Sequence, residues 1–251
     1  MAQRAELTGP EAGTADVWRA RRQDASGRLA GLLDDTERQR WAAYRRGADQ
    51  ERFLVGCALA KTVLAGYAGQ RPAGLSFDRT CPRCGQPHGK PVVKGGEFEH
   101  SVTHSGDLVA VAVARTPVGV DVEQADGRAR PPGGDENPEA LARLVLADVE
   151  QAALESVPPS ARPREFLLAW TRKEAVTKAT GDGLRASFRQ VVTAGPRGAP
   201  RLLAWPYPQA PESVFLADLE LEPGYEAALA VIGRCDSVRV RDGSALLAAG
   251  A

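Results

Sequence analysis

Two carboxylates near the middle of the chain have a spacing that suits metal chemistry. Asp121 and Glu123 lie within residues 118–123, where valine alternates with other residues. Because successive side chains of a strand point to opposite faces, the two carboxylates share a face with Gly119, which leaves room beside them. Two like charges this close cost free energy unless a cation lies between them. The pattern suits oxygen ligation of Mg2+, although an exposed strand face accommodates it equally well without a metal.

A third carboxylate lies on a helix later in the chain. The sequence predicts this helix around residues 166–179, with Pro163 in its first turn and Gly181 as its stop. Glu174 and Lys178 are four residues apart, so they share a helical face and can contact each other. Such pairs are common on solvated helices, and their spacing alone assigns them no chemistry.

The composition is that of an ordinary soluble globular protein. The 251 residues include 32 Lys and Arg and 32 Asp and Glu, and this balance argues against a general nucleic-acid binder, which needs a basic excess. No run approaches the ~20 apolar residues of a membrane span, and residues 1–25 do not resemble a signal peptide. The four cysteines do not indicate a disulfide scaffold. We therefore expect a cytoplasmic protein with no membrane or nucleic-acid partner.

Alternating helix and strand patterns follow the length of the chain. Helices are predicted over residues 50–66 and 139–155. A strand over 108–113 is expected to form a hairpin with 118–123, and a loop rich in Pro and Gly follows at 124–138. Further short strands are predicted around 187–193, 200–205, 214–220 and 227–232.

These elements divide the chain into two halves with a helix and strands in each. We predict an N-terminal α+β subdomain over residues 16–117 and a C-terminal α+β subdomain over 118–240. Residues 1–15 are expected to form a mobile tail, and residues 241–251 a frayed one.

Basic residues gather around the helix predicted over 50–66. They form either a solubilising surface or an anion site, because guanidinium groups match the oxygens of a phosphate. Lys90 lies in a Gly-Lys-Pro turn and is a further candidate cation, and His104 lies where a turn meets a strand edge. The basic residues of the cluster are Arg38, Arg40, Arg45, Arg46, Arg52 and Lys61.

The segment CPRCGQPHGKP contains a group of potential metal ligands. Cys81 and Cys84 have the C-x2-C spacing of a zinc knuckle, and His88 supplies a third ligand. A structural zinc site has four ligands, and the other two cysteines, Cys57 and Cys235, are far away in sequence. Either a zinc site or a plain turn rich in Pro and Gly fits this segment.

Two motifs taken together are more specific than either alone. GVDVE at 119–123 and WTRKEAVTKATGDGL at 170–184 resemble the G-x-D-x-E and W-x-x-K-E-A-x-x-K signatures of 4′-phosphopantetheinyl transferases of the surfactin-synthetase-activating (Sfp-like) type. RFLVG at 52–56, GKP at 89–91 and THSGD at 103–107 also match, in the family's order. Two features depart from the pattern: Thr103 replaces the usual serine, and the cysteine segment is an insertion.

The resemblance implies a fold and an activity. The fold is two similar α+β subdomains related by a pseudo-twofold axis, each with a small, mainly antiparallel sheet packed on a long helix. The activity is Mg2+-dependent transfer of the phosphopantetheine arm of coenzyme A to a serine of an apo acyl or peptidyl carrier protein, which releases 3′,5′-ADP. The resemblance also implies a monomer, and it leaves open the carrier protein and its pathway, whether polyketide, nonribosomal peptide or fatty-acid synthesis.

The resemblance also implies roles for individual residues. Asp121, Glu123 and Glu174 would hold Mg2+, with Glu174 also the general base for the serine, directly or through water. Lys178 would steady the pyrophosphate or donate to the leaving 3′,5′-ADP. Lys173 is given no chemistry and is expected at the surface. The remaining coenzyme A contacts would be Lys90 and His104 to phosphates, and Arg52 and Arg40 to the 3′-phosphate.

Two other functions use parts of the same sequence. A metal-dependent phosphodiesterase or nuclease would use the three carboxylates and hydrolyse its substrate without an acceptor protein. A zinc-knuckle binding module would use the cysteine segment and leave both carboxylate motifs without a role. The absence of a net positive charge weakens the nucleic-acid versions of both.

Overall fold

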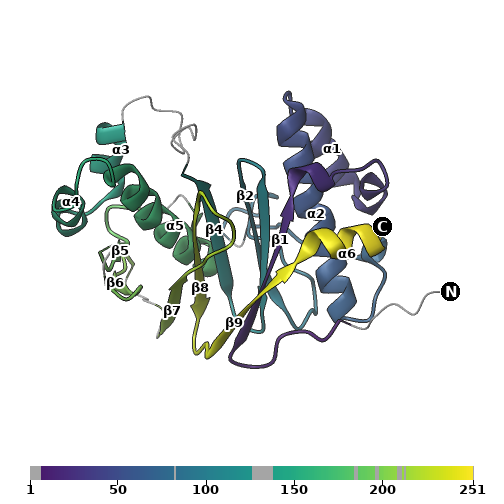
Figure 1. Ribbon diagram of the computed structural model, residues 1–251. Coiled ribbons are helices and arrows are strands. Elements are labelled where there is room, and N and C mark those ends of the chain that lie inside the picture. Colours follow the sequence, from purple (N-terminus) through teal and green to yellow (C-terminus); the bar gives the residue numbers. More distant parts are fainter. Residues whose placement is uncertain are drawn as a thin grey trace. The chain divides into compact units, whose positions relative to one another are not determined.

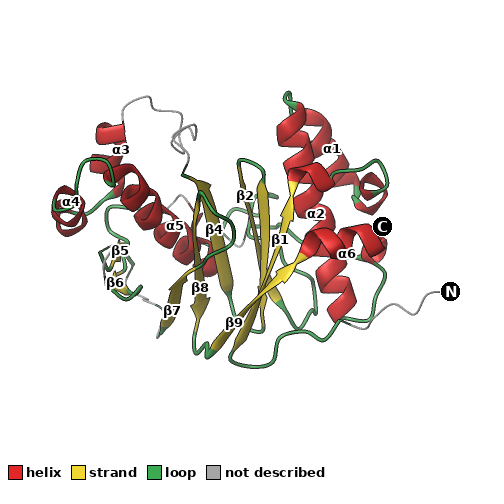
Figure 2. Cartoon of the chain, viewed as in Figure 1, coloured by secondary structure: helices red, strands yellow, loops and turns green. Residues whose placement is uncertain are grey.

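The chain divides into two compact units, residues 1–116 with 235–251, and residues 117–234 (Figure 1). Each unit combines helices with strands, so the predicted α+β class is confirmed (Figure 2). Most of the loop predicted at 124–138 lies outside the described residues. The computed structural model describes residues 7–81, 83–125, 138–183, 186–195, 198–207, 211 and 213–250.

The first unit is built on a four-stranded sheet in the order β2-β3-β1-β9. Neighbouring strands are antiparallel except for β1 and β9, which run parallel. The face that carries Val109, Val111 and Val113 packs against a long buried helix, α2. The strands are β1 (Thr14–Arg21), β2 (Glu99–Ser105), β3 (Leu108–Ala114) and β9 (Ser237–Asp242), and the α-helices are α1 (Asp35–Ala43), α2 (Gly47–Tyr67) and α6 (Gly243–Gly250).

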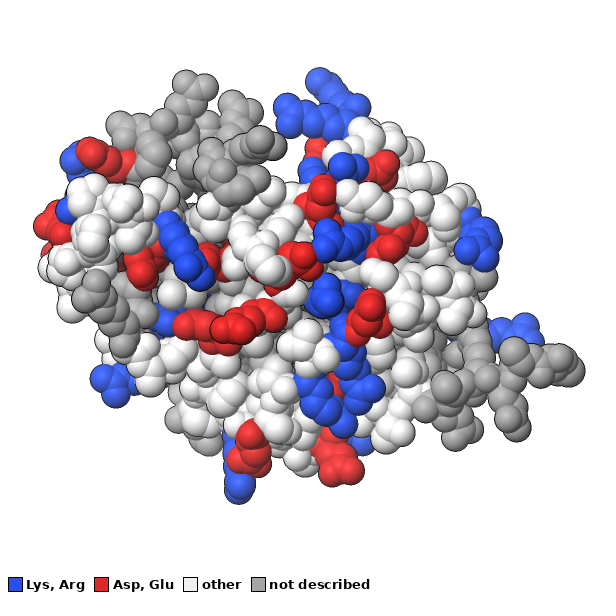
Figure 3. All heavy atoms as spheres, in the orientation of Figure 1, with Lys and Arg blue, Asp and Glu red and all other residues white. Residues whose placement is uncertain are grey.

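The C-terminal end of the chain belongs to the first unit. The prediction of a frayed tail over 241–251 is wrong, because β9 pairs with β1 and α6 follows it directly. Leu247 of α6 is buried in the core of this unit. Figure 3 shows a band of Lys and Arg side chains over β1 and β9. Between these two strands, Arg239 donates to the buried Asp16 at 2.6 Å. This pairing of distant segments was not readable from local sequence patterns.

The second unit contains a three-stranded antiparallel sheet in the order β4-β8-β7. A long helix, α5, packs on this sheet through Ala175, Val176 and Ala179. Pro163 lies in the first turn of α5 and Gly181 ends it with φ of 79°, as predicted, although the helix begins earlier than predicted. The strands are β4 (Val118–Gln124), β5 (Val192–Thr193), β6 (Leu202–Ala204), β7 (Val214–Asp218) and β8 (Tyr225–Ile232), and the helices are α3 (Pro138–Val145), α4 (Asp148–Glu155) and α5 (Arg162–Thr180).

Two predicted elements of this region are wrong. The strand over 118–123 does not form a hairpin with 108–113, because β3 has β1 on one edge and β2 on the other, and β4 pairs with β8 instead. The single helix predicted over 139–155 is two helices. Ala147 between them is extended, with ψ of 163°, and its N–H donates to the Glu150 side chain at 2.8 Å, which caps the second helix. None of the described helices is long and apolar enough to cross a membrane.

A buried ion pair joins three segments of the second unit. Lys173 of α5 is fully buried, so its expected place at the surface is wrong. Its Nζ donates to Glu150 at 2.5 Å and to the carbonyl oxygens of Phe188 and Val191 at 2.8 and 2.6 Å. Glu150 also accepts from Thr193 N–H at 2.9 Å. Because both charges are paired and hydrogen-bonded, the cluster ties α4 and residues 188–193 to α5.

The backbone of α5 lies directly against β4 at Gly119. A Cβ added to Gly119 would lie 2.0 Å from the carbonyl oxygen of Ala175 and 2.5 Å from the amide nitrogen of Ala179. Both atoms belong to the helix backbone and have no rotamer that moves them away. The expectation that Gly119 leaves room beside the carboxylates is therefore wrong, because the helix fills that room.

We predict that Lys173→Met lowers the free energy of unfolding by about 3–5 kcal/mol, because it leaves the Glu150 carboxylate buried without its cation. Urea denaturation measures this loss. The double variant K173M/E150Q should lose less than K173M, because the amide carries no charge. Arg189→Met, which removes an exposed pair with Asp148, is the control and should cost less than about 1 kcal/mol. Equal losses for K173M and R189M would contradict the assignment.

We also predict that Gly119→Ala lowers the free energy of unfolding by at least about 1–3 kcal/mol, because α5 must move off β4 to admit a methyl group. Gly198→Ala is the matched control in the same unit, since its added Cβ would meet only the Gly195 carbonyl at 3.5 Å and a methyl at 3.8 Å. Urea denaturation of both variants tests the contact. Similar stability in the two would show that α5 does not approach β4 this closely.

Candidate active site

The two motifs that the sequence separates meet where α5 lies on β4. The Lys178 ammonium of α5 donates to Asp121 Oδ1 at 2.6 Å and to the Val120 carbonyl oxygen at 3.3 Å. Asp121 is buried, with 4% of its surface exposed, and Lys178 is partly exposed. Asp121 lies on the same face of β4 as Gly119, two residues along, so the close approach at Gly119 brings its carboxylate to the helix.

The charges of this group act strongly on one another. Burial raises the pKa of Glu174, and the negative charge of Asp121 raises it further, while Lys178 opposes both effects. Burial by itself would lower the pKa of Lys178, but the charges of Asp121, Glu174 and Glu123 outweigh it and raise that pKa. All three predicted carboxylates thus surround one ammonium group, and their combined charge is more negative than Lys178 can balance.

The sequence analysis missed a fourth carboxylate beside this group. Glu226 of β8 is the register partner of Glu123 on β4, so the two side chains lie on the same face of the sheet. Arg164 of α5 pairs with Glu226 and supplies the compensating charge. The position of Glu226 beside Glu123 follows from the pairing of β4 with β8. These strands are about a hundred residues apart in the chain, and no local sequence pattern predicts their pairing.

The donor set on β4 and α5 fits Mg2+ by its chemistry. Asp121, Glu123 and Glu174 offer only carboxylate oxygens, which are the hard ligands that Mg2+ prefers, and their excess negative charge favours a divalent cation. Their oxygens are not gathered within 4.8 Å of one another. Among the described residues, that closeness is found only in the group Cys81, Cys84 and His88. The chain thus provides suitable donors without a fully assembled cage.

Two of the predicted anion-binding residues lie at one turn of the first unit. Arg52 near the start of α2 donates to the Gly106 carbonyl oxygen at 2.7 Å and pairs with Asp49. Gly106 is in the turn between β2 and β3, two residues after His104, whose side chain is exposed. Arg52 therefore lies beside the turn that carries His104.

Of the other two predicted anion-binding residues, Lys90 lies in the segment between α2 and β2, and Arg40 of α1 contacts this segment. The Lys90 ammonium pairs with Glu99 at 3.1 Å, and the Arg40 guanidinium donates to the Pro87 carbonyl oxygen at 2.7 Å. Burial lowers the pKa of Lys90, and the charge of Glu99 opposes this. Arg40 thus holds the chain segment that leads to Lys90.

One member of the basic cluster is structural. Lys61 is fully buried, and its ammonium pairs with Glu37 at 2.6 Å and donates to the Leu32 carbonyl oxygen at 2.9 Å. Glu37 also pairs with Arg79 at 2.9 Å. The idea that Lys61 belongs to an anion site is therefore wrong, because its charge is used to join α1 to α2.

The chain resembles proteins of one family. Residues 117–230 match the family model described as the 4′-phosphopantetheinyl transferase superfamily. The chain is 31% identical over 190 residues to the 4′-phosphopantetheinyl transferase psf-1 of Bacillus pumilus, a match that covers 74% of this chain and 73% of that protein. It is 32% identical over 162 residues to the 4′-phosphopantetheinyl transferase HetI of Nostoc sp..

The extent of these matches differs. The match to HetI spans 62% of this chain and 62% of HetI, which is less than two thirds of the relative's length. The crystal structure of Thermotoga maritima holo-[acyl-carrier-protein] synthase (AcpS) is 22% identical, with a TM-score of 0.38 over 47% of this chain and 64% of that chain, and is too distant to bear on the fold. On the strength of the match to psf-1 and of the family model, the chain belongs to the 4′-phosphopantetheinyl transferase superfamily.

Proposed function

We propose that this protein transfers the 4′-phosphopantetheine moiety of coenzyme A to a serine of an apo acyl or peptidyl carrier protein, with Mg2+, and releases 3′,5′-ADP. The observation that carries the proposal is the group of Asp121, Glu123, Glu174 and Lys178 at the contact of α5 with β4. The family of the chain supports it.

Charge complementarity supports coenzyme A as the substrate. Its pyrophosphate and 3′-phosphate need cations, and guanidinium forks match phosphate oxygens in geometry. In the proposal, Arg52 and Arg40 bind the 3′-phosphate, and Lys90 and His104 bind further phosphate oxygens. Arg52 contacts the turn that follows His104, and Arg40 contacts the segment that leads to Lys90, which supports their acting in pairs.

Asp121, Glu123 and Glu174 would hold Mg2+. When bound, the ion would neutralise charge on the pyrophosphate oxygens. The serine oxygen attacks the phosphorus that carries the pantetheine arm, a new phosphorus–oxygen bond forms, and the bond to 3′,5′-ADP breaks. Glu174 takes the serine proton, directly or through one water. Lys178 donates to the oxygen of the departing 3′,5′-ADP.

The reaction itself is tested by the intact mass of an apo carrier protein incubated with the enzyme, coenzyme A and Mg2+. We expect the carrier to gain the mass of one phosphopantetheine arm, and the gain to disappear with EDTA. Asp121→Asn and Glu174→Gln should each slow the transfer by at least about 100-fold. Glu155→Gln, an exposed carboxylate of the same unit, is the matched control and should leave the rate unchanged.

Two results would overturn the proposal. Cleavage of coenzyme A at the same rate with and without a carrier would indicate a phosphodiesterase. Near wild-type transfer by a folded E174Q variant would remove Glu174 from the chemistry.

We further predict that Glu174→Gln raises the thermal midpoint at neutral pH in metal-free buffer. The raised pKa means that the folded chain binds the Glu174 proton more tightly than the unfolded chain does. Stability is therefore lost as pH rises from the ordinary glutamate pKa of about 4.3 through the raised value. Glutamine does not incur this loss, so the advantage of E174Q should vanish as the pH falls towards about 4. A lower midpoint for E174Q at neutral pH would contradict the burial of an excess charge.

A further inference from the structure

The segment between Asp78 and Val92 closes on itself through backbone hydrogen bonds. The N–H of Asp78 donates to the Val92 carbonyl oxygen at 2.8 Å, and the N–H of Val92 donates to the Asp78 carbonyl oxygen at 2.9 Å. These two hydrogen bonds hold the ends of the segment together. Within it, Gly89 N–H donates to the Arg79 carbonyl oxygen at 2.7 Å. Cys81 is almost fully buried, but residues 83–88 are exposed. The tip of this segment therefore has little apolar contact to hold it.

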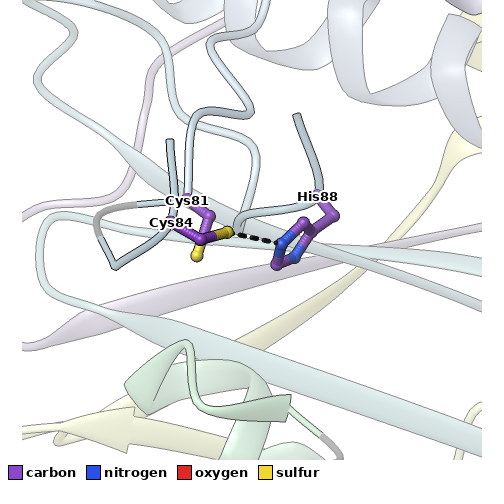
Figure 4. A group of neighbouring side chains, drawn as sticks. All are labelled: Cys81, Cys84 and His88. Carbon is purple, nitrogen blue, oxygen red and sulfur yellow. Dashed lines mark hydrogen bonds between the residues drawn. The ribbon is translucent and has the colours of Figure 1, made fainter. Parts of the chain in front are cut away.

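Three metal-binding side chains converge at this tip. The ligand atoms of Cys81, Cys84 and His88 all lie within 4.8 Å of one another. Figure 4 shows the Cys84 thiol directed at the His88 ring, with Cys84 Sγ and His88 Nε2 3.0 Å apart, and Cys81 beside them. Ligands about 2.0–2.3 Å from zinc at two corners of a tetrahedron are about 3.4–3.8 Å apart, so small side-chain movements suffice to share one ion.

The backbone of the segment is shaped around Cys81. Backbone amides of Arg83 and Cys84 donate to its sulfur, an arrangement that stabilises a thiolate. The N–H of Gly85 donates to the Cys81 carbonyl oxygen at 2.9 Å, and the positive φ of 71° at Gly85 allows this tight turn. Cys81 N–H in turn donates to the Gln86 carbonyl oxygen at 2.8 Å. A plain turn needs none of the three ligands, and this backbone directs all of them to one point.

We propose that residues 81–88 bind one Zn2+ ion through Cys81, Cys84 and His88. Two thiolates and one imidazole are a donor set that selects zinc over Mg2+ or Ca2+. No further His, Cys, Asp or Glu joins the group among the described residues, so water takes the fourth position. The ion uses none of the carboxylates of β4 and α5, and it holds Cys84 and His88 to Cys81.

The bound ion would fix the segment that carries Lys90. Arg40 already holds this segment from outside through the Pro87 carbonyl oxygen, and Lys90 follows His88 by two residues. Loss of zinc should therefore raise KM for coenzyme A while leaving kcat nearly unchanged. This consequence rests on the proposed function, whereas the metal content of the protein does not.

Metal analysis of the tag-free, chelator-washed full-length protein by inductively coupled plasma mass spectrometry tests the site. We expect one zinc per chain in the wild type and almost none in Cys84→Ser and His88→Gln, whose side chains are exposed so that the fold tolerates the change. Cys57→Ser, a cysteine of α2 outside the group, is the matched control and should keep its zinc. Cobalt exchange should give a thiolate-to-metal charge-transfer band that Cys84→Ser weakens.

Three results would overturn the proposal. The first is a wild-type protein without zinc, and the second is zinc retained by both ligand variants. The third is a metal-free protein whose mass shows a disulfide between Cys81 and Cys84, which would make the pair a redox element. A protein that binds zinc but transfers no phosphopantetheine would leave this site standing and overturn only the proposed function.

Discussion

The second unit depends on backbone contact between a helix and a strand at Gly119. A side chain at this position would overlap the backbone of α5, so glycine sets how closely α5 lies on β4. The same distance decides whether Lys178 reaches Asp121, because Lys178 directly precedes Ala179 and Asp121 follows Gly119 by two residues. G-x-D-x-E and K-E-A-x-x-K are thus two sides of one packing interface. The glycine belongs to the motif for a steric reason, and under the proposed function the carboxylates belong to it for a chemical one.

The neighbouring residues Lys173 and Glu174 show how a helix divides structural and chemical tasks. Lys173 is fully buried and paired with Glu150 and two carbonyl oxygens. Glu174 is near Asp121 and Lys178 and carries a charge that its surroundings do not fully balance. Because the buried pair resists rotation of α5 about its axis, it fixes the direction of Glu174.

Local patterns in the sequence predicted the C-terminal end of α5, the helix that became α2 and the face of β4 that carries Asp121. These features follow from capping residues and from the periods of helix and strand, which act over a few residues. The partner of β4 was predicted wrongly because pairing depends on which edges are already occupied, and β3 has both edges filled. Lys61 and Lys173 were misjudged for a similar reason, since a lysine is buried only where the fold brings a carboxylate to it. Glu226 was missed because its place opposite Glu123 exists only in the folded sheet.

Two of the cations proposed for coenzyme A, Lys90 and Arg52, share a feature with Lys178: each is already paired with a carboxylate. Lys90 pairs with Glu99, Arg52 with Asp49, and Lys178 with Asp121. This pairing keeps long side chains ordered, and it means that a phosphate must compete with an internal anion. At Asp121 a bound divalent cation would resolve this competition. Asp121 would then hold the cation, and Lys178 would be available to a phosphate oxygen. Under the proposed function, metal and coenzyme A would therefore bind more tightly together than either binds alone.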